Sequence, residues 1–309
     1  MAFMESRNRS TVTHFTLLGF SGDPNVQIVL FLIFLFIYVV LLVANILLIL
    51  VVTIDCRLHN PMYFFLVNLS IVNIGGPSVT VPRMLVEFVS GNKSIVFAAC
   101  VTEIFFSLVL GGCECLLLVF MAYDRYVAIC NPLHYNTIMN RSVCALMIAV
   151  TWTVSFATSS LNIFFLCRLT FCGSNIINHF LCSYTSLIFL SCSDTSALDF
   201  MIFLGSTTLL LVPFLLILLS YYKIISSIKG IDSRQYKAFS SCTPHLIVVI
   251  LYYGTAVIIF MRPKVSVDGN RNKVLSVFYV ITIPMLNPLI YSLRNKDVHR
   301  ALRKLFRLQ

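Results

Sequence analysis

The chain has 309 residues, of which 59% are hydrophobic and only 11% are charged, and its mean hydropathy is +0.92. Soluble domains usually carry about 25% charged residues, so this composition excludes an ordinary soluble domain and indicates a membrane protein. The formal net charge of +10 would suggest a nucleic-acid partner in a soluble protein. In a membrane protein it reflects basic residues at the cytoplasmic ends of the spans, so we expect no nucleic-acid partner.

Seven apolar segments are each long enough to cross the bilayer, which takes about 20 residues of helix. Their apolar residues are continuous rather than alternating, which favours helices over the strands of a β-barrel. The predicted fold class is therefore an all-α membrane protein, a seven-transmembrane helix bundle with a short amphipathic C-terminal helix, built as a single domain over residues 1–309. The predicted spans are 24–54, 58–82, 100–122, 142–167, 200–222, 238–261 and 274–293.

Residues 1–23 precede the first span and are predicted to form an extracellular tail. The first span is too long for the apolar core of a signal peptide, and no cleavage site of small residues follows it, so we expect it to stay in the membrane. Asn8 begins an N-x-S glycosylation acceptor in this tail, and Asn92 begins a second candidate in a short outer loop.

Four polar residues fall near the middle of different spans: Asn45 in the first, Asn73 in the second, Glu114 in the third and Asn287 in the seventh. They could form one polar cluster that holds water or a small cation. Alternatively, they could simply join helices through hydrogen bonds, each worth about 0.6 kcal/mol. We favour hydrogen bonding together with water.

The third span carries further polar features. Glu103 lies one turn inside its outer end, where the carboxylate could meet a polar ligand group or, as we prefer, reach extracellular water. Gly111 and Gly112 leave room for a ligand or, more commonly, for a closely packed helix. Asp124 and Arg125 follow at the cytoplasmic end as an ion pair, which is either a latch that frees Arg125 or an anchor to the headgroups.

Four cysteines are predicted on the outer side: Cys100 at the start of the third span, and Cys172, Cys182 and Cys192 in the loop after the fourth. Disulfides form in extracellular or lumenal environments, so we place this side and the N-terminus outside the cell and the C-terminus in the cytoplasm. Four cysteines allow three connectivities, which the residues alone leave open.

Residues 296–307 form the predicted cytoplasmic helix. Its apolar positions form one helical stripe, and basic residues fill the opposite face. Such a helix lies in the headgroup plane and is attracted to anionic membrane lipid, whereas we see no second domain on which a soluble helix could pack. The stripe consists of Val298, Ala301, Leu302, Leu305 and Phe306.

Nothing in the sequence indicates catalysis. The six histidines are scattered, and we find no catalytic, phosphate-binding or metal-binding motif. We therefore expect neither an enzyme nor a metal or cofactor site.

Five motifs occur in order at the ends of the spans: LHNPMYFFLVNLS (58–70), MAYDRYVAICNPLHY (121–135), SY (220–221), KAFSSCTPHL (237–246) and PMLNPLIYSLRNKDV (284–298). With them, the chain resembles the olfactory receptor family of rhodopsin-like (class A) G-protein-coupled receptors over about residues 10–303. Within that family it resembles the large class II, which is adapted to volatile, mostly apolar odorants.

The resemblance assigns roles to residues that were ambiguous on their own. It implies that Asp124, Arg125 and Tyr126 form the inactive-state latch at the G-protein face, and that Arg125 is released on activation. It also implies two disulfides, Cys100–Cys182 and Cys172–Cys192. The residues expected to rearrange beside the latch are Tyr221, Asn287, Pro288 and Tyr291.

The resemblance further implies a ligand pocket between spans three, five, six and seven, near the outer side. Its lining would be mostly apolar with a few hydroxyls, and such pockets discriminate weakly, by about 1–3 kcal/mol per methylene. Carried over by position, the lining residues are Glu103, Ser107, Leu108, Gly111, Gly112, Gly205, Ser206, Leu209, Tyr253, Ala256, Val257, Phe260, Ser276, Val277 and Val280.

The chain departs from the family pattern at four positions. Asn73 stands where the family usually has Asp, so one charge is missing and a sodium ion at Glu114 and Asn73 is in doubt. Ser183 also replaces a usual Asp, and Pro244 replaces a usual Ser in the helix that moves on activation. Phe260 lacks a hydroxyl that many relatives carry.

The function implied by the resemblance is that of an odorant receptor in the plasma membrane. It would bind a small-molecule odorant and activate a heterotrimeric, stimulatory olfactory-type G protein, which raises cyclic AMP. A receptor of the same family with a role outside olfaction would share every motif. A transporter or channel is the alternative class, but the related halves and paired broken helices of secondary transporters are not evident in the sequence.

Overall fold

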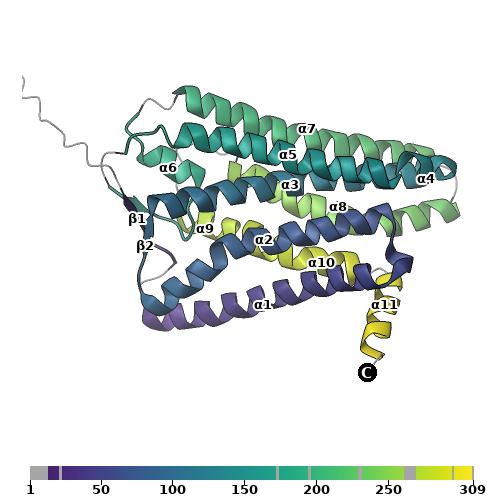
Figure 1. The fold of residues 1–309 in the computed structure, drawn as a ribbon, viewed down its shortest axis with the longest axis horizontal. Helices are drawn as coiled ribbons and strands as arrows, with labels where there is room; N and C mark the ends of the chain where they lie inside the picture. Colours follow the sequence, from purple (N-terminus) through teal and green to yellow (C-terminus); the bar gives the residue numbers. More distant parts are fainter. Residues whose placement is uncertain are drawn as a thin grey trace, which may run out of the picture.

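The computed structural model describes residues 13–20, 23–171, 174–193, 196–228, 232–260, 269–293 and 296–307. Within these ranges, seven helical spans are long and apolar enough to cross a membrane, which confirms the predicted seven-span bundle. The spans lie alongside one another, and the C-terminal helix leaves the bundle at a steep angle at one end (Figure 1).

The first four spans are single helices: α1 (Pro24–Ile54), α2 (Pro61–Ser90), α3 (Phe97–Cys130) and α5 (Arg141–Leu166). The fifth and sixth spans are α7 (Ser196–Ile228) and α8 (Asp232–Phe260). The seventh consists of α9 (Gly269–Val277), the five-residue π-helix η3 (Phe278–Thr282) and α10 (Ile283–Leu293). The shorter helical elements are η1 (Cys56–Leu58), η2 (Pro132–His134), α4 (Tyr135–Ile138), α6 (Tyr184–Leu190) and the C-terminal α11 (Lys296–Arg307).

Local sequence explains where several helices begin and end. The side chains of Asp23, Asn60 and Asn140 each accept a hydrogen bond from a free backbone N–H at the starts of α1, α2 and α5. Proline follows the first two caps, where its fixed φ suits a first helical turn. α2 ends at Gly91, whose φ of +69° is the left-handed conformation that commonly terminates a helix.

α2 extends eight residues beyond the predicted end of the second span at 82. It continues through Pro77 and Pro82, which membrane helices tolerate because neighbouring groups satisfy the freed carbonyls. The prediction stopped at Arg83 because a lone charge is expensive in the membrane. In the structure that charge is compensated by Glu87 one turn later, with an N–O distance of 3.1 Å.

A small sheet covers the outer end of the bundle. Strand β1 (His14–Leu17) lies between β2 (Ser94–Val96), to which it is antiparallel, and β3 (Ile176–Ile177), to which it is parallel. Phe15 and Leu17 of β1 are fully buried. The end of the N-terminal segment therefore packs against the bundle, which the prediction of a simple tail over 1–23 did not foresee.

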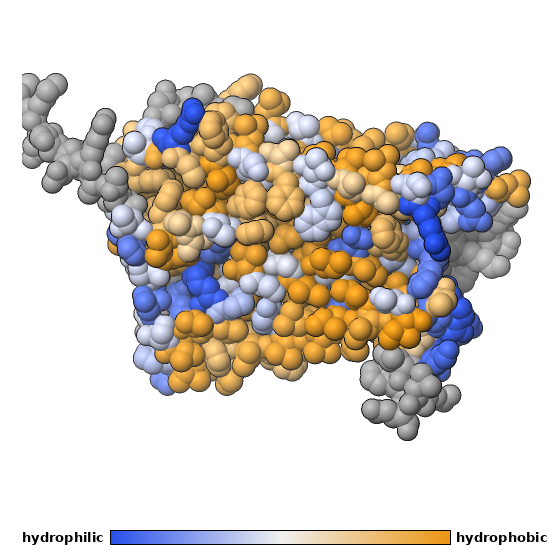
Figure 2. All heavy atoms as spheres, in the orientation of Figure 1, coloured by the Kyte–Doolittle hydropathy of each residue, from blue (hydrophilic) through white to orange (hydrophobic). Residues whose placement is uncertain are grey.

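The outside of the bundle is apolar along its length. Figure 2 shows a broad apolar belt over the helices, with hydrophilic residues gathered at the two ends. Large side chains such as Ile28, Leu32 and Phe36 of α1 are more than half exposed. In a membrane these residues face lipid, so the exposed apolar surface is what a spanning bundle requires.

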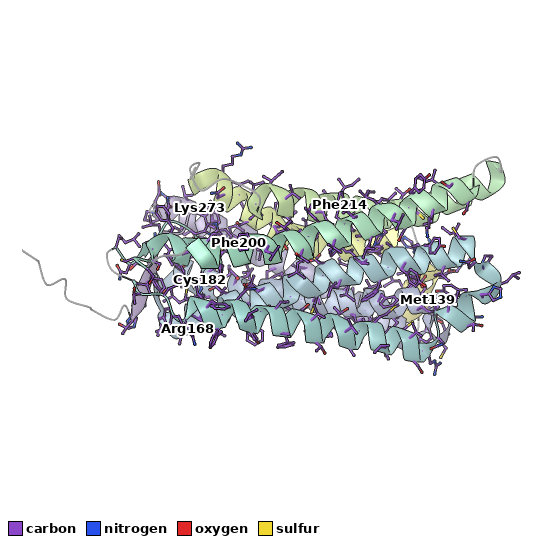
Figure 3. The ribbon with its side chains drawn as sticks, turned by 90° about the horizontal axis from the view of Figure 1, so that it is seen from above. Met139, Arg168, Cys182, Phe200, Phe214 and Lys273 are labelled. Carbon is purple, nitrogen blue, oxygen red and sulfur yellow. A yellow bond between two sulfur atoms is a disulfide. The ribbon has the colours of Figure 1, made fainter. Side chains whose placement is uncertain are left out.

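The two ends of the bundle carry different features. Arg168, Cys182 and Lys273 lie at the end that holds the sheet, and Met139 lies at the opposite end (Figure 3). α4 and α11 are also at the end opposite the sheet (Figure 1). The residues predicted to be extracellular and those predicted to be cytoplasmic thus lie at opposite ends of the bundle.

Candidate functional site

A buried polar cluster joins four helices near the middle of the bundle. The Asn287 side-chain amide on α10 donates to the oxygens of Asn73 on α2 and Glu114 on α3, both at 3.1 Å. Asn73 in turn donates to the Asn45 side-chain oxygen on α1 at 3.4 Å. The three asparagines are at most 1% exposed. The four residues that sequence analysis grouped by depth are therefore brought together.

Most oxygens of this cluster are engaged in hydrogen bonds. It contains a single carboxylate, and the Glu114, Asn73 and Asn45 oxygens accept amide hydrogens. A sodium ion bound to these oxygens would require the amides to turn away. The Asn287 side-chain oxygen and the Tyr291 hydroxyl are buried without a hydrogen-bond partner among the described residues, and buried polar groups of this kind are usually satisfied by water.

The C-terminal end of α3, which carries Asp124 and Arg125, has contacts that were not predicted. The buried Asp124 carboxylate accepts a hydrogen bond from the Tyr135 hydroxyl at 2.7 Å, and the Arg125 guanidinium contacts the Met62 sulfur on α2. Within the described ranges, the ion pairs closer than 4.0 Å do not include Asp124 with Arg125. The two side chains are therefore not in direct contact here, because adjacent residues of a helix do not face each other, and the latch role of Asp124 and Arg125 stays a prediction.

Tyr135 holds Asp124 from the segment that follows α3. Burial and the neighbouring carboxylate raise the pKa of the Tyr135 hydroxyl, so it remains a hydrogen-bond donor. Sequence analysis quoted Tyr135 as the last residue of a motif but gave it no role. The available signal was a phenol in the segment directly after the span that carries Asp124.

His245 on α8 joins three helices near the same end. Its ring nitrogens lie 2.7 Å from the Tyr221 hydroxyl on α7 and 3.0 Å from the Leu118 carbonyl oxygen on α3. The imidazole is only 1% exposed. Sequence analysis assigned Tyr221 to the switch but missed its partner, although a histidine inside an apolar span is itself a signal of a buried hydrogen bond.

Glu103 is not in contact with outer water, contrary to the preferred interpretation. Its carboxylate is buried and lies 3.3 Å from the Arg83 Nε on α2. The Thr80 hydroxyl and the Cys182 backbone N–H also donate to it, at 3.2 and 3.4 Å. Arg83 further donates to the Phe180 carbonyl oxygen at 2.7 Å. Glu103 therefore ties α2, α3 and the outer loop together instead of presenting a free carboxylate to a ligand.

The outer loop is fixed to α3 by a disulfide between Cys100 and Cys182, as the resemblance implied. Cys172, of the second predicted pair Cys172–Cys192, lies outside the described residues. Ser183, next to the bridge, caps α6 by accepting the Ser186 backbone N–H at 3.1 Å. Asp and Ser both serve as helix caps, so the departure from the family pattern at this position preserves the local structure.

A network of hydroxyl groups lies where the ligand pocket is predicted. The Tyr252 hydroxyl on α8 donates to the Gly111 carbonyl oxygen at 2.8 Å, and Tyr279 of η3 donates to Tyr252 at 2.9 Å. The Tyr253 hydroxyl donates to the Cys115 carbonyl oxygen at 3.2 Å. Three spans thus meet through phenol groups, of which sequence analysis named only Tyr253. A tyrosine inside a span needs a partner for its hydroxyl, which was the available signal.

The seventh span contains a π-helix beside residues that are predicted to line the pocket. Val277 and Val280 pack against the cluster of Phe34, Val81 and Met84 on the α1–α2 side, whereas the Tyr279 hydroxyl donates to Tyr252 of α8. A π turn adds a residue and so rotates the side chains beyond it. The assignment of Val277 and Val280 to the ligand pocket stays a prediction.

The other predicted lining residues lie in different surroundings. Gly112 packs against α5, where an added Cβ would lie 3.0 Å from the Ser155 hydroxyl oxygen, so it serves helix packing. The Ser276 hydroxyl oxygen lies 3.3 Å from Nε2 of His179, a residue of the loop between α5 and α7. The remaining residues lie on α3, α7 and α8: Ser107, Leu108, Gly205, Leu209, Ala256 and Val257. The side chains of Ser206 and Phe260 lie outside the described part of the chain.

His179 is a buried loop residue that sequence analysis set aside. Its ring accepts the Leu181 backbone N–H at 3.3 Å and stacks near Phe180. Burial, together with the positive charge of Lys273, lowers the pKa of His179 to about 4. A neutral histidine is therefore part of the packed outer cap.

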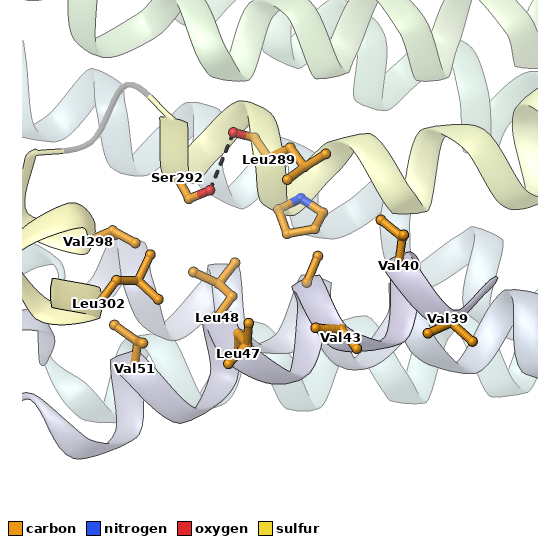
Figure 4. Close-up of a pocket in the computed structure, with 12 residues that line it drawn as sticks. Val39, Val40, Val43, Leu47, Leu48, Val51, Leu289, Ser292, Val298 and Leu302 are labelled. Carbon is orange, nitrogen blue, oxygen red and sulfur yellow. Dashed lines mark hydrogen bonds between the residues drawn. The ribbon is translucent and has the colours of Figure 1, made fainter. Parts of the chain in front are cut away.

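A cavity of about 340 Å³ lies elsewhere, between α1, α10 and α11 on the outside of the bundle (Figure 4). None of its lining residues belongs to the predicted ligand set. Within the described ranges, no group of three or more His, Cys, Asp or Glu side chains could hold a metal ion.

The sequence profile of the family described as "Olfactory receptor" matches residues 34–308. Olfactory receptor 1f45 of Rattus norvegicus is 43% identical over 308 residues, which cover 99% of this chain and 98% of that protein. Olfactory receptor 6Q1 of Homo sapiens is 46% identical over 98% of this chain and 97% of its own length. Olfactory receptor 11L1 of Homo sapiens is 45% identical over 98% of this chain and 95% of its own length.

These matches extend over nearly the whole chain and agree with its seven membrane-spanning helices. The chain therefore belongs to the olfactory receptor family, a family of receptors and not of enzymes.

Proposed function

We propose that this chain is an odorant receptor of the plasma membrane. It binds small, volatile, mostly apolar ligands within the helix bundle and activates a heterotrimeric, stimulatory olfactory-type G protein, which raises cyclic AMP. Membership of the olfactory receptor family supports the receptor role. The observation that carries the ligand-gated mechanism is the network of Tyr279, Tyr252 and the Gly111 carbonyl, which joins three spans.

The position of this network defines where a ligand would act. Ser107 lies one helical turn outward of Gly111, so both residues share a face of α3. The Ser107 side chain is exposed, whereas Tyr252 is 1% exposed. A ligand on the outer side of the tyrosines would therefore contact Ser107 and rest on the phenol groups. One hydroxyl among apolar neighbours favours mostly apolar ligands with a single polar group.

Signal transfer follows from the contacts of α3 with α8. Below the tyrosines, α8 is held to α3 again by His245, which also binds Tyr221 of α7. A ligand that alters the Tyr252–Gly111 contact changes the relative position of α8 and α3 at both points. Binding then shifts an equilibrium between conformations that exist without ligand.

The orientation in the membrane is also a proposal. The Cys100–Cys182 disulfide and strand β1 lie at the same end of the bundle. Disulfides persist in oxidising environments, which supports an extracellular position for this end and for the N-terminus. α11 and its basic residues then lie in the cytoplasm, in agreement with the positive-inside rule.

Cyclic AMP measurements in cells that express the chain with the olfactory-type G protein would test this function. A panel of volatile compounds is applied, and an N-terminal epitope is labelled on intact cells to measure surface receptor. We expect a dose-dependent rise that Arg125→Ala abolishes. Tyr252→Phe removes one hydroxyl with little change in volume, and the lost hydrogen bond, worth about 1 kcal/mol, should shift the dose–response about fivefold.

Tyr38→Phe is the matched control, because the Tyr38 hydroxyl is bonded to Ser78 between α1 and α2, away from the proposed pocket. The mechanism is wrong if Tyr38→Phe shifts the response as much as Tyr252→Phe does. The proposed G-protein signalling is wrong if the wild type and Arg125→Ala, present in equal amounts at the cell surface, give the same cyclic AMP response.

A further inference from the structure

The cavity between α1, α10 and α11 is an apolar groove that opens toward the membrane. Val39, Val43, Leu47 and Val51 line it from α1, and Val298 and Leu302 line it from α11 (Figure 4). Ser292 is the polar side chain among its lining residues, and its hydroxyl donates to the Leu289 carbonyl oxygen at 3.4 Å. The walls therefore offer an occupant almost only apolar contact.

The length of the groove matches one leaflet of a bilayer. Twelve residues separate Val39 from Val51 on α1, which corresponds to ~18 Å at 1.5 Å per residue. The hydrocarbon layer is about 30 Å thick, so one leaflet is about 15 Å deep. The groove thus runs from near the middle of the membrane to the level of α11.

The groove suits a slender occupant. Its volume of about 340 Å³ lies along ~18 Å of α1. A single hydrocarbon chain matches this elongated apolar space. The basic helix α11 at one end favours an anionic lipid over a second copy of the chain, whose own α11 carries the same positive charge.

α11 supplies positive charge at the mouth of the groove. Its residues Val298 and Ala301 are buried against the bundle, while Arg300, Arg303 and Lys304 are exposed. Arg300 lies 3.4 Å from Asp297, which partly neutralises it. The helix sequence contains five Lys or Arg residues and one Asp. Basic residues on an amphipathic helix beside a span attract anionic lipid headgroups.

We propose that this groove binds one acyl chain of an anionic phospholipid from the leaflet on the α11 side, with the headgroup against Arg303 and Lys304. In this arrangement the apolar tail of the lipid contacts α1 and α10, and its phosphate contacts the basic residues of α11. This site does not depend on the proposed signalling function. It fixes α11 against α1, and it makes the lipid part of the folded cytoplasmic end.

Photolabelling of the full-length protein in lipid nanodiscs would test the site. The probes are phosphatidylserine and phosphatidylcholine that carry the same diazirine-labelled acyl chain, each present at a low fraction in unlabelled phosphatidylcholine. Labelled peptides are mapped by mass spectrometry. We expect phosphatidylserine to label residues 39–51 and 289–302 more strongly than phosphatidylcholine does.

Two variants separate the tail from the headgroup. Ala44→Phe fills the groove and should abolish labelling there, whereas Val150→Phe on the exposed face of α5 should not. Arg303→Gln with Lys304→Gln should lower the preference for phosphatidylserine by about thirtyfold, because each of the two basic residues contributes about 1 kcal/mol near an anionic surface. Arg141→Gln removes an exposed charge at the start of α5 and should leave the preference unchanged.

Two results would overturn the proposal. Equal labelling by both probes, unaffected by the double variant, would mean that only bulk lipid contacts the groove. Cross-links between receptor copies at α1, together with loss of lipid labelling, would mean that a second copy covers it.

Discussion

Replacement of Arg83 by methionine should destabilise the outer end of the receptor. The guanidinium donates to Glu103, to Glu87 and to the Phe180 carbonyl oxygen, at 3.3, 3.1 and 2.7 Å. Without it, the Glu103 carboxylate, which is 4% exposed, loses its positive partner. Removal of one partner of a buried ion pair costs about 3–5 kcal/mol.

The structure indicates that the loss of stability in Arg83→Met lies at the lower end of that range. The Arg83 side chain is 26% exposed, so water already screens part of the interaction. Thr80 and the Cys182 backbone also remain as donors to Glu103. We therefore expect a loss of about 3 kcal/mol in the free energy of unfolding.

Thermal unfolding can be followed with a thiol reagent that becomes fluorescent on reaction. Four free cysteines are buried in the bundle and should react only on unfolding: Cys113, Cys115, Cys144 and Cys242. The exposed Cys56 and Cys167 are blocked beforehand. Wild type, Arg83→Met and the double variant Arg83→Met with Glu103→Gln are compared in the same detergent.

The double variant tests the reasoning most directly. Because it removes Glu103, the more deeply buried of the two carboxylates that lose Arg83, it should recover at least about 1.5 kcal/mol relative to Arg83→Met. Arg57→Met is the control, since it breaks an exposed ion pair with Asp55 and should leave the unfolding temperature unchanged. If the double variant is no more stable than Arg83→Met, an unpaired charge is not the cause of the loss.

Three further outcomes are expected in the same unfolding assay. Gly112→Val should lower the free energy of unfolding by about 1–3 kcal/mol, because the added side chain clashes with Ser155 of α5. Adding Ser155→Gly should restore part of this stability. If it restores none, α5 is not what the valine clashes with. Ser183→Ala should lower the free energy of unfolding by about 1 kcal/mol, because it removes the cap of α6, whereas Ser183→Asp should leave it unchanged. If both variants lose the same stability, capping is not the role of Ser183. The pKa of His179 falls from 6.5 to about 4 on folding, so between these values the unfolded state binds more protons and stability falls as pH is lowered. The free energy of unfolding should fall by roughly 2 kcal/mol from pH 7 to pH 5, and His179→Gln should abolish this pH dependence. If the variant shows the same pH dependence as the wild type, His179 is not its source.

Much of the architecture could be predicted because the membrane leaves few alternatives. An apolar segment of about 20 residues must satisfy its backbone internally, so continuous runs such as 24–54 specify helices. Polar residues inside such helices avoid lipid and turn toward one another. This reasoning placed Asn45, Asn73, Glu114 and Asn287 at one depth, and the structure joins them.

The partners of individual side chains were harder to predict, because they depend on the rotation and depth of each helix. Glu103 and Asp124 were recognised as unusual, yet their partners Arg83 and Tyr135 were not. Arg83 was excluded from its span because it is charged, although pairing makes it acceptable there. Asp124 was paired with its neighbour in sequence, although a helix turns adjacent residues about 100° apart.

The sequence by itself determined the seven spans, the family and the depth of the polar residues, since each follows from local composition or from short motifs. Only the tertiary structure decided which faces meet. Tyr279 of the π-helix meets Tyr252 of α8, and β1 pairs with strands 80 and 160 residues away. α11 packs beside α1, and the two helices line the groove together with α10. Contacts of this kind join residues distant in sequence, and their geometry is set by the packing of whole helices, which no local pattern records.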